Sequence, residues 1–198
     1  MAIKLASIFF TMILVDNYVL AKFLGICPFL GVSKKLDSAV GMSLAVTFVM
    51  VMATAATWPL YMGILAPNGL EYLQTIVFIL VIAILVQLLE NFLKKFIPAL
   101  YKSLGVYLPL ITTHCTILGV TILNLDNGYS FPESIVCAAG AGIGFLVAMV
   151  LFSGVRRKVE QAIVPECFKG LPITLVAAAM TSLSFMGFGG IVEAIFGV

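Results

Sequence analysis

Two cysteine-containing stretches hold the residue types in this chain that are best suited to chemistry. Residues 27–32 read Cys-Pro-Phe-Leu-Gly-Val, and residues 115–120 read Cys-Thr-Ile-Leu-Gly-Val. Both follow the pattern C-x-x-L-G-V and begin 88 residues apart. Four identities in an apolar sequence can arise by chance, but each stretch also lies in the first predicted span of its half of the chain, which indicates an internal repeat.

Three kinds of chemistry are open to Cys27 and Cys115. Free cysteine is among the most buried residue types, so both can be small packing residues. A disulfide is a second possibility, although the C-x-x-C pair of many thiol oxidoreductases is missing from this sequence. Iron–sulfur ligation is a third, because the sulfur atoms of such a cluster accept hydrogen bonds from free backbone N–H groups beside glycine and proline.

The elements that must position these cysteines are those of a membrane protein. Hydrophobic residues make up 62% of the 198 residues and charged residues only 10%. Ordinary globular domains have roughly 45–50% and about 25%, respectively. This composition excludes a soluble enzyme, a disordered chain and a nucleic-acid-binding module, so the main environment of the chain is the lipid bilayer.

The pattern predicts an all-α protein with six transmembrane helices. A crossing of about 30 Å needs about 20 apolar residues. Nine of the eleven Lys and Arg residues fall in the first, third and fifth connections, which the positive-inside rule places in the cytoplasm. Both termini are therefore expected on the outer side. The six spans are predicted at residues 3–32, 36–65, 70–93, 105–125, 131–155 and 171–196.

The repeat divides the chain into two three-helix halves, residues 1–100 and 101–198, within one integral membrane domain. Three spans per half require the halves to have opposite orientations, which is the inverted repeat of many transport folds. Spans one and four, which carry the cysteines, are expected to be broken near the midplane. The residues that indicate these breaks are Asp16, Asn17, Gly25, Pro28 and Gly31 in span one, and Gly105, Pro109 and Gly119 in span four.

A [2Fe–2S] cluster needs four ligands, and this topology lets one chain supply two. Cys137 falls near the outer end of span five, and Cys167 falls in the fifth, cytoplasmic connection. Most of the bilayer separates them, so they cannot both reach a midplane site. We interpret Cys137 as core packing and Cys167 as an incidental loop thiol. Ligation by Cys27 and Cys115 would then require two more cysteines from a second chain.

A few polar residues inside the spans are further candidates. Asp16, Asn17 and Glu90 are candidates for an ion path, because ionisable groups in a membrane are usually functional. The structural alternatives are pairing of Asp16 with Lys22 and of Glu90 with Lys94. Around the cysteines, the residues expected to support the ligands rather than to be ligands are Gly25, Pro28, Thr113 and His114.

Three runs of the sequence resemble a known family of membrane subunits. They are FLGICPFLGVSKK at residues 23–35, LPLITTHC at residues 108–115 and FMGFGG at residues 185–190. The family contains the A and E subunits of the Rnf complex and the D and E subunits of the sodium-translocating NADH:quinone oxidoreductase. One departure is His114, where asparagine is expected in close relatives.

The resemblance implies a subunit of a translocase that is not active alone. In that family two homologous subunits of opposite orientation share one intramembrane [2Fe–2S] cluster, and Cys27 and Cys115 match the ligand positions. It implies an E-type homologue as cluster-sharing partner, together with the B, C, D and G subunits of the Rnf complex. Those subunits carry FMN, riboflavin and further Fe–S clusters, and they pass electrons from ferredoxin to NAD⁺ while Na⁺ or H⁺ is translocated.

The charge distribution and the resemblance agree on orientation. Outward termini are expected of the A-type rather than the E-type members, in a multi-pass protein of the prokaryotic inner (cytoplasmic) membrane. The rival interpretation is a non-redox secondary transporter or channel subunit, which would share the inverted repeat and the broken helices. Such a protein would have no need of matched cysteines at both breaks.

Overall fold

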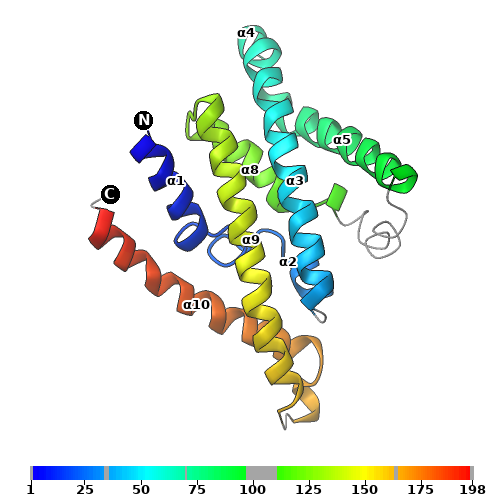
Figure 1. Cartoon of the computed structure of the whole chain (residues 1–198), viewed down its shortest axis with the longest axis vertical. Helices are drawn as coiled ribbons and strands as arrows, with labels where there is room; N and C mark the ends of the chain where they lie inside the picture. The colour runs from blue at the N-terminus through cyan, green and yellow to red at the C-terminus, as the bar shows by residue number, and fades with distance from the viewer. Residues whose placement is uncertain (1, 34–35, 70, 97–110, 163–164, 197–198) are drawn as a thin grey trace.

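The computed structural model describes residues 2–33, 36–69, 71–96, 111–162 and 165–196, and in these ranges the chain is helical without strands (Figure 1). Gly105 and Pro109, which are expected to flank the second break, lie outside the described residues. The longer helices are α1 (Ala2–Leu14), α2 (Ile26–Val32), α3 (Leu36–Leu60), α5 (Gln74–Phe96), α8 (Cys115–Asp126), α9 (Phe131–Glu160) and α10 (Leu171–Phe196). The short turns in the described ranges are η1 (Tyr61–Leu65), α4 (Ala66–Asn68), η2 (Glu71–Leu73) and η3 (Glu166–Phe168).

Three of the described helices are long and apolar enough to cross a membrane by length and composition: Ser38–Asn68, Gln74–Asn91 and Phe131–Glu160. Three more apolar helices are shorter, at Lys4–Leu14, Cys115–Asp126 and Leu171–Gly187. The predicted first span is thus divided, because α1 ends at Leu14 and α2 begins only at Ile26. The break next to Asp16 and Asn17 is confirmed, whereas Gly31 lies within α2 and Gly119 lies within α8, so neither glycine interrupts its helix.

The second span is continuous but irregular. Pro59 lies inside α3 and has no N–H to donate, and a π-helical turn, Tyr61–Leu65, follows directly. The helix then continues as α4 and stops at Gly69, whose φ of 64° is left-handed. Proline and the π turn therefore change the hydrogen-bond ladder without dividing the span.

Helices α3 and α9 lie side by side at the centre of the bundle (Figure 1). Glycine allows their close approach, because a Cβ at Gly142 of α9 would lie 2.5 Å from Thr47 Cγ2 of α3. Large apolar side chains fill the remaining space around this contact. The fully buried ones include Met42, Val46, Met50, Phe145, Met149 and Phe152.

The other helices pack around this central pair. Helix α1 contacts α9, and α8 contacts α3. Helix α10 contacts α9 and α1, whereas α5 contacts α3 and α8. In Figure 1 the two outermost helices, α5 and α10, diverge from the central pair on opposite sides. The repeated motif relates α2 to α8, and with that pairing the α2–α3 contact corresponds to α8–α9 and the α3–α5 contact to α9–α10.

The outer faces of the bundle are apolar. Large hydrophobic side chains are exposed along α3, α5 and α10. A water-soluble protein rarely leaves so continuous an apolar surface uncovered, so this surface suits contact with lipid or with other membrane subunits. The exposed side chains include Leu44, Phe48, Ile76, Ile84, Leu88, Leu175, Met180 and Leu183.

Polar contacts join three segments of the chain at one end of the bundle. Lys4 of α1 forms an ion pair of 2.9 Å with Glu133 at the start of α9. Glu133 also accepts hydrogen bonds from the backbone N–H and the hydroxyl of Ser130, which completes a capping box. Trp58 Nε1 donates to Tyr129 O at 3.1 Å. The start of α1, the region around Trp58 and the α8–α9 connection therefore share one end of the molecule.

Candidate functional site

The chain between α1 and α2 is braced by Asn17. Its Nδ2 donates to Gly144 O of α9 at 2.8 Å, and its Oδ1 accepts from Val19 N at 3.1 Å. The side chain is buried, and Gly144 allows the approach because a Cβ there would lie 3.2 Å from Asn17 Nδ2. Asn17 is a candidate for an ion path by sequence, but both ends of its amide are used to hold the first break against α9.

Helix α2 places Cys27 in its first turn. Gly25 is the N-cap, with φ 87° and ψ 25°, a left-handed conformation that favours glycine. Pro28 follows within the same turn, where no intrahelical N–H is needed, so it starts this helix rather than breaks it. The side chain of Cys27 is exposed. The sequence therefore ends the break at Gly25 and presents Cys27 directly after it.

Helix α8 places Cys115 in the same way. His114 is the N-cap, with extended φ and ψ of −74° and 109°, and its Nδ1 accepts from Thr116 N at 3.3 Å. Cys115 is the first residue of the helix and its side chain is exposed. The sulfur of Cys115 thus lies at a helix N-terminus, the end that carries a partial positive charge.

The two cysteine turns meet. Gly25 N donates to Cys115 Sγ at 2.8 Å, a contact between residues 90 positions apart. A Cβ at Gly25 would lie 2.4 Å from Thr116 Oγ1 and 2.8 Å from His114 Cε1, so only glycine fits here without displacing α8. This contact brings the start of α2 against the start of α8. It directs a backbone N–H at a cysteine sulfur, which is the hydrogen bond that iron–sulfur ligands accept.

His114 and Thr116 form the buried side of this contact. The His114 side chain is only 3% exposed and lies edge-on to Phe145, with ring centroids 5.3 Å apart. Within the described part of the chain, His114 Nε2 and Thr116 Oγ1 have no hydrogen-bond partner. Thr113 is exposed just before the N-cap. His114 thus stabilises the first turn of α8 as its N-cap.

The donor set fits a cluster shared with another chain. All four cysteines are free thiols. Among the described residues, no three His, Cys, Asp or Glu side chains come together as a metal site, so the described part of the chain does not by itself complete a four-ligand site. Both thiols are exposed, and one accepts an N–H···S bond. Cys137 is fully buried in α9 and Cys167 is exposed in η3, as core packing and a loop thiol should be.

The structure does not bring the three residues predicted to line an ion path into contact with one another. Asp16 and Lys22 are 3.9 Å apart and partly exposed, as the pairing alternative predicts. Glu90 lies on α5, which packs mainly on α3 and α8. No hydrogen bond or ion pair links Glu90 to Asp16 or Asn17 within the described ranges. Asn17 is a brace, which leaves Asp16 and Glu90 as separate candidates.

Sequence reasoning misses Arg156 as a site residue, because by pattern it is one of several basic residues near a connection. The structure buries it on α9, where its Nη1 donates to Leu30 O and, at 2.8 Å, to Ser33 Oγ. Its Nε lies 3.2 Å from Glu160 Oε1. The i,i+4 spacing of Arg156 and Glu160 is the only sequence signal, and it does not reveal the contact with α2.

Comparisons with known proteins identify the family of this chain. Residues 5–192 match the Rnf-Nqr family, described as "Rnf-Nqr subunit, membrane protein". The A subunit of the ion-translocating oxidoreductase complex of Syntrophotalea carbinolica is 54% identical, over 91% of this chain and 93% of its own length. The A subunit of the Na(+)-translocating ferredoxin:NAD(+) oxidoreductase complex of Acetobacterium woodii is 53% identical, over 94% and 97%. The chain therefore belongs to the Rnf-Nqr family of membrane-protein subunits.

Proposed function

We propose that this chain is a membrane subunit of a redox-driven ion pump, and that Cys27 and Cys115 are two of the four ligands of an intramembrane [2Fe–2S] cluster. The observation that carries the proposal is the contact between the two cysteine turns, in which Gly25 N donates to Cys115 Sγ. Neither a packing cysteine nor a transporter without redox chemistry needs two exposed thiols at two adjoining helix starts.

The residues around the thiols have separate tasks. Gly25 stabilises negative charge on Cys115 Sγ through its N–H, and His114 fixes the first turn of α8 by accepting from Thr116 N. The start of α8 adds its positive helix end. Because both thiols are exposed, a second chain has access to them. A [2Fe–2S] cluster, when bound there, supplies one-electron transfer inside the hydrocarbon layer.

The partner in this proposal is a homologous subunit of opposite orientation that gives the other two cysteines. The names of relatives support a complex that oxidises ferredoxin, reduces NAD⁺ and moves ions, and one relative is named for Na⁺. We assign this chain to such a complex, with B, C, D and G subunits that carry FMN, riboflavin and further Fe–S clusters. The complex translocates Na⁺ or H⁺ across the cytoplasmic membrane of a prokaryote.

Six spans in two inverted halves, with both termini outside, are part of the same proposal. Two helix contacts support it, because exchanging the halves so that α2 matches α8 converts the α2–α3 contact into α8–α9, and α3–α5 into α9–α10. The Lys4–Glu133 ion pair supports a shared side for the N-terminus and the fourth connection. Arg157 and Lys158 are exposed at the end of α9, as expected of a cytoplasmic connection.

Iron content and EPR of the reduced, intact complex test the ligand assignment. We expect Cys27→Ala and Cys115→Ala each to abolish the same [2Fe–2S] signal and electron transfer, with the other clusters intact. Cys167→Ala is the matched control, because this thiol is exposed but lies in η3, outside both cysteine turns. Unchanged iron, signals and turnover in the first two variants would favour a non-redox transporter subunit.

The ion path is tested separately, through Asp16 and Glu90. If either carboxylate lies on the path, Asp16→Asn or Glu90→Gln reduces ion uptake into proteoliposomes while the cluster signal stays. If uptake and electron transfer remain coupled as in the wild type, the carboxylates have only structural roles, such as the contact of Asp16 with Lys22.

A further inference from the structure

The end of α2 opposite to Cys27 is held by a buried arginine. Helix α2 has seven residues, too few to be stable alone, and the last carbonyls of any helix have no partner within it. Arg156 Nη1 donates to one of these carbonyls, Leu30 O, and to the hydroxyl of Ser33 directly after the helix. The contact joins α2 to α9 although the two bonded residues are 126 positions apart in the chain.

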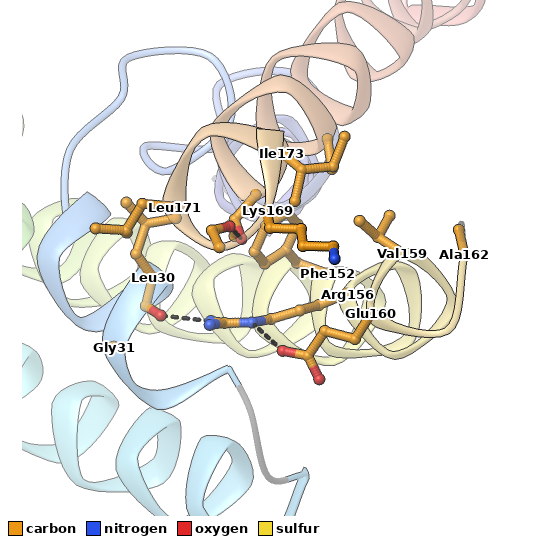
Figure 2. A pocket seen from close by; sticks show the side chains of 13 residues that line it. Leu30, Gly31, Phe152, Arg156, Val159, Glu160, Ala162, Lys169, Leu171 and Ile173 are labelled. Atoms are coloured by element: carbon orange, nitrogen blue, oxygen red, sulfur yellow. Dashed lines mark hydrogen bonds and ion pairs between the residues drawn. The ribbon is translucent and has the colours of Figure 1, made fainter. Parts of the chain in front are cut away.

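Burial makes this arginine unusual among the basic residues around it. Its side chain is 9% exposed, whereas Arg157 and Lys158, which follow it, are exposed. Charge near an apolar core is costly unless it is paired and hydrogen-bonded. Here Leu30, Ser33 and Glu160 all meet the guanidinium, and Figure 2 shows it lying between Leu30 and Glu160. A neutral residue would avoid this cost, so the charge itself needs an explanation.

A cavity of about 590 Å³ borders the guanidinium between α2, α9 and the start of α10 (Figure 2). Apolar side chains such as Phe152 and Ile173 form much of its wall, and Lys169 reaches it from the other side. Glu160 is 57% exposed, so solvent weakens its countercharge more than it weakens the charge of Arg156. The charge of Arg156 is therefore only partly offset by Glu160.

The charge is close enough to matter at Cys27. Leu30 follows Cys27 by three residues, so with a rise of 1.5 Å per residue and one hydrogen bond, the guanidinium lies on the order of 10 Å from the Cys27 sulfur. At an effective dielectric constant of about 20, a unit charge at this distance changes a one-electron equilibrium by about tenfold. A positive charge favours the more negative, reduced state.

We propose that Arg156 is a positioning residue for the cysteine site: it fixes α2 against α9 and, by its charge, stabilises the reduced form of a cluster bound at Cys27. This inference rests on the proposed function for its redox part. Its structural part, the anchoring of α2, stands on the hydrogen bonds to Leu30 and Ser33 alone.

The test compares Arg156→Gln and Arg156→Lys with Arg157→Gln in the intact complex. Arg157→Gln is the matched control, because it removes the same charge from the neighbouring, exposed position. We expect Arg156→Gln to lower the midpoint potential of the [2Fe–2S] EPR signal. A tenfold change in the one-electron reduction equilibrium corresponds to about 59 mV. Arg156→Lys should have a midpoint potential close to that of the wild type, and Arg157→Gln should have the same midpoint potential as the wild type.

A substitution that is expected to shift the midpoint potential in the opposite direction distinguishes an electrostatic effect from misfolding. Glu160→Gln removes an exposed countercharge and should raise the midpoint potential, whereas loss of structure at the site would not produce opposite shifts in the two variants. If the Arg156→Gln complex does not assemble, Glu160→Gln still decides the electrostatic part. Equal potentials in the wild type, Arg156→Gln and Glu160→Gln would overturn it.

Hydrogen exchange measures the anchoring without reference to a cluster. We expect backbone amides 29–33 to exchange several-fold faster in Arg156→Gln than in Arg157→Gln, since α2 loses its tie to α9. Ser33→Ala should show the same change in smaller measure. Equal exchange in all variants would overturn the anchoring. If Cys27→Ala leaves the EPR signal intact, the proposed function fails, while this exchange measurement still decides the role of Arg156.

Discussion

Helices α2 and α8 perform the same task with different support. Each begins after an interruption of the helical backbone and presents an exposed cysteine in its first turn. Helix α8 has twelve residues and a side-chain cap from His114, and the Asn127 N–H closes its other end on Leu123 O. Helix α2 has seven residues and a glycine N-cap without a side-chain hydrogen bond. Its far end is held by Arg156 of α9.

The difference shows that one cysteine turn is determined locally and the other by tertiary contacts. Short isolated helices are marginal in stability, and α2 is shorter than α8 and has no side-chain cap of its own. We therefore expect substitutions in distant partners to loosen the Cys27 turn, and substitutions in the immediate sequence to loosen the Cys115 turn. Four substitutions test this comparison.

The largest effect is expected for Gly25→Ala, which damages both turns at once. The new Cβ would lie 2.4 Å from Thr116 Oγ1, and φ at this position is 87°. We expect the [2Fe–2S] EPR signal and the corresponding iron to be lost from the intact complex. Gly31→Ala in the same helix is the control, because nothing in the described structure beyond its own turn lies within 4 Å of its Cβ position. A normal signal in Gly25→Ala would show that the two turns need not touch.

Asn17→Ala should loosen the first break and leave α8 unaffected. The substitution leaves the buried N–H of Val19 without its hydrogen-bond acceptor, which lowers the free energy of unfolding by about 1–3 kcal/mol. Hydrogen exchange of the intact complex should increase in residues 18–33 and stay constant in residues 115–126. Asn68→Ala is the control, since Asn68 Nδ2 donates to Ile64 O at an exposed site. Equal exchange in α2 and α8 would contradict the independence of the two turns.

His114→Ala should act on the second turn only. It removes the acceptor for Thr116 N, and loss of an N-cap costs about 0.5–2 kcal/mol. His114→Asn keeps a side-chain acceptor, so its effect should be much smaller. The measurement is the exchange rate of the first amides of α8 in the intact complex. If asparagine and alanine behave alike at position 114, the cap is not what holds this turn.

Gly119→Ala should have the smallest effect, although it also concerns a close contact between the two regions. A Cβ there would lie 2.7 Å from Leu24 Cδ1, the far end of a flexible side chain that can rotate away. Alanine also favours the helix by about 0.8–1.0 kcal/mol over glycine, which offsets the cost. We expect a thermal unfolding temperature of the complex close to that of the wild type. Loss of the EPR signal would mean that Leu24 cannot move.

Several features of the site could be predicted because they depend on neighbouring residues. The position of the first break follows from Asp16 and Asn17, which interrupt an apolar run, and the start of α2 from Gly25 and Pro28. Ser130 and Glu133 form a capping box at the start of α9, a pattern readable from spacing alone. Gly31 is expected to mark a break but lies inside α2, because glycine is tolerated in a helix that packing stabilises.

Composition is enough to predict the membrane setting, and the repeated motif is enough to single out the two cysteines. Three contacts could not be predicted in this way: Gly25 N with Cys115 Sγ, Asn17 with Gly144 O, and Arg156 with Leu30 O at the end of α2. The cause is the distance between the partners along the chain. Each of these bonds joins residues 90 or more positions apart, and such partners are chosen by how the helices pack rather than by local propensity.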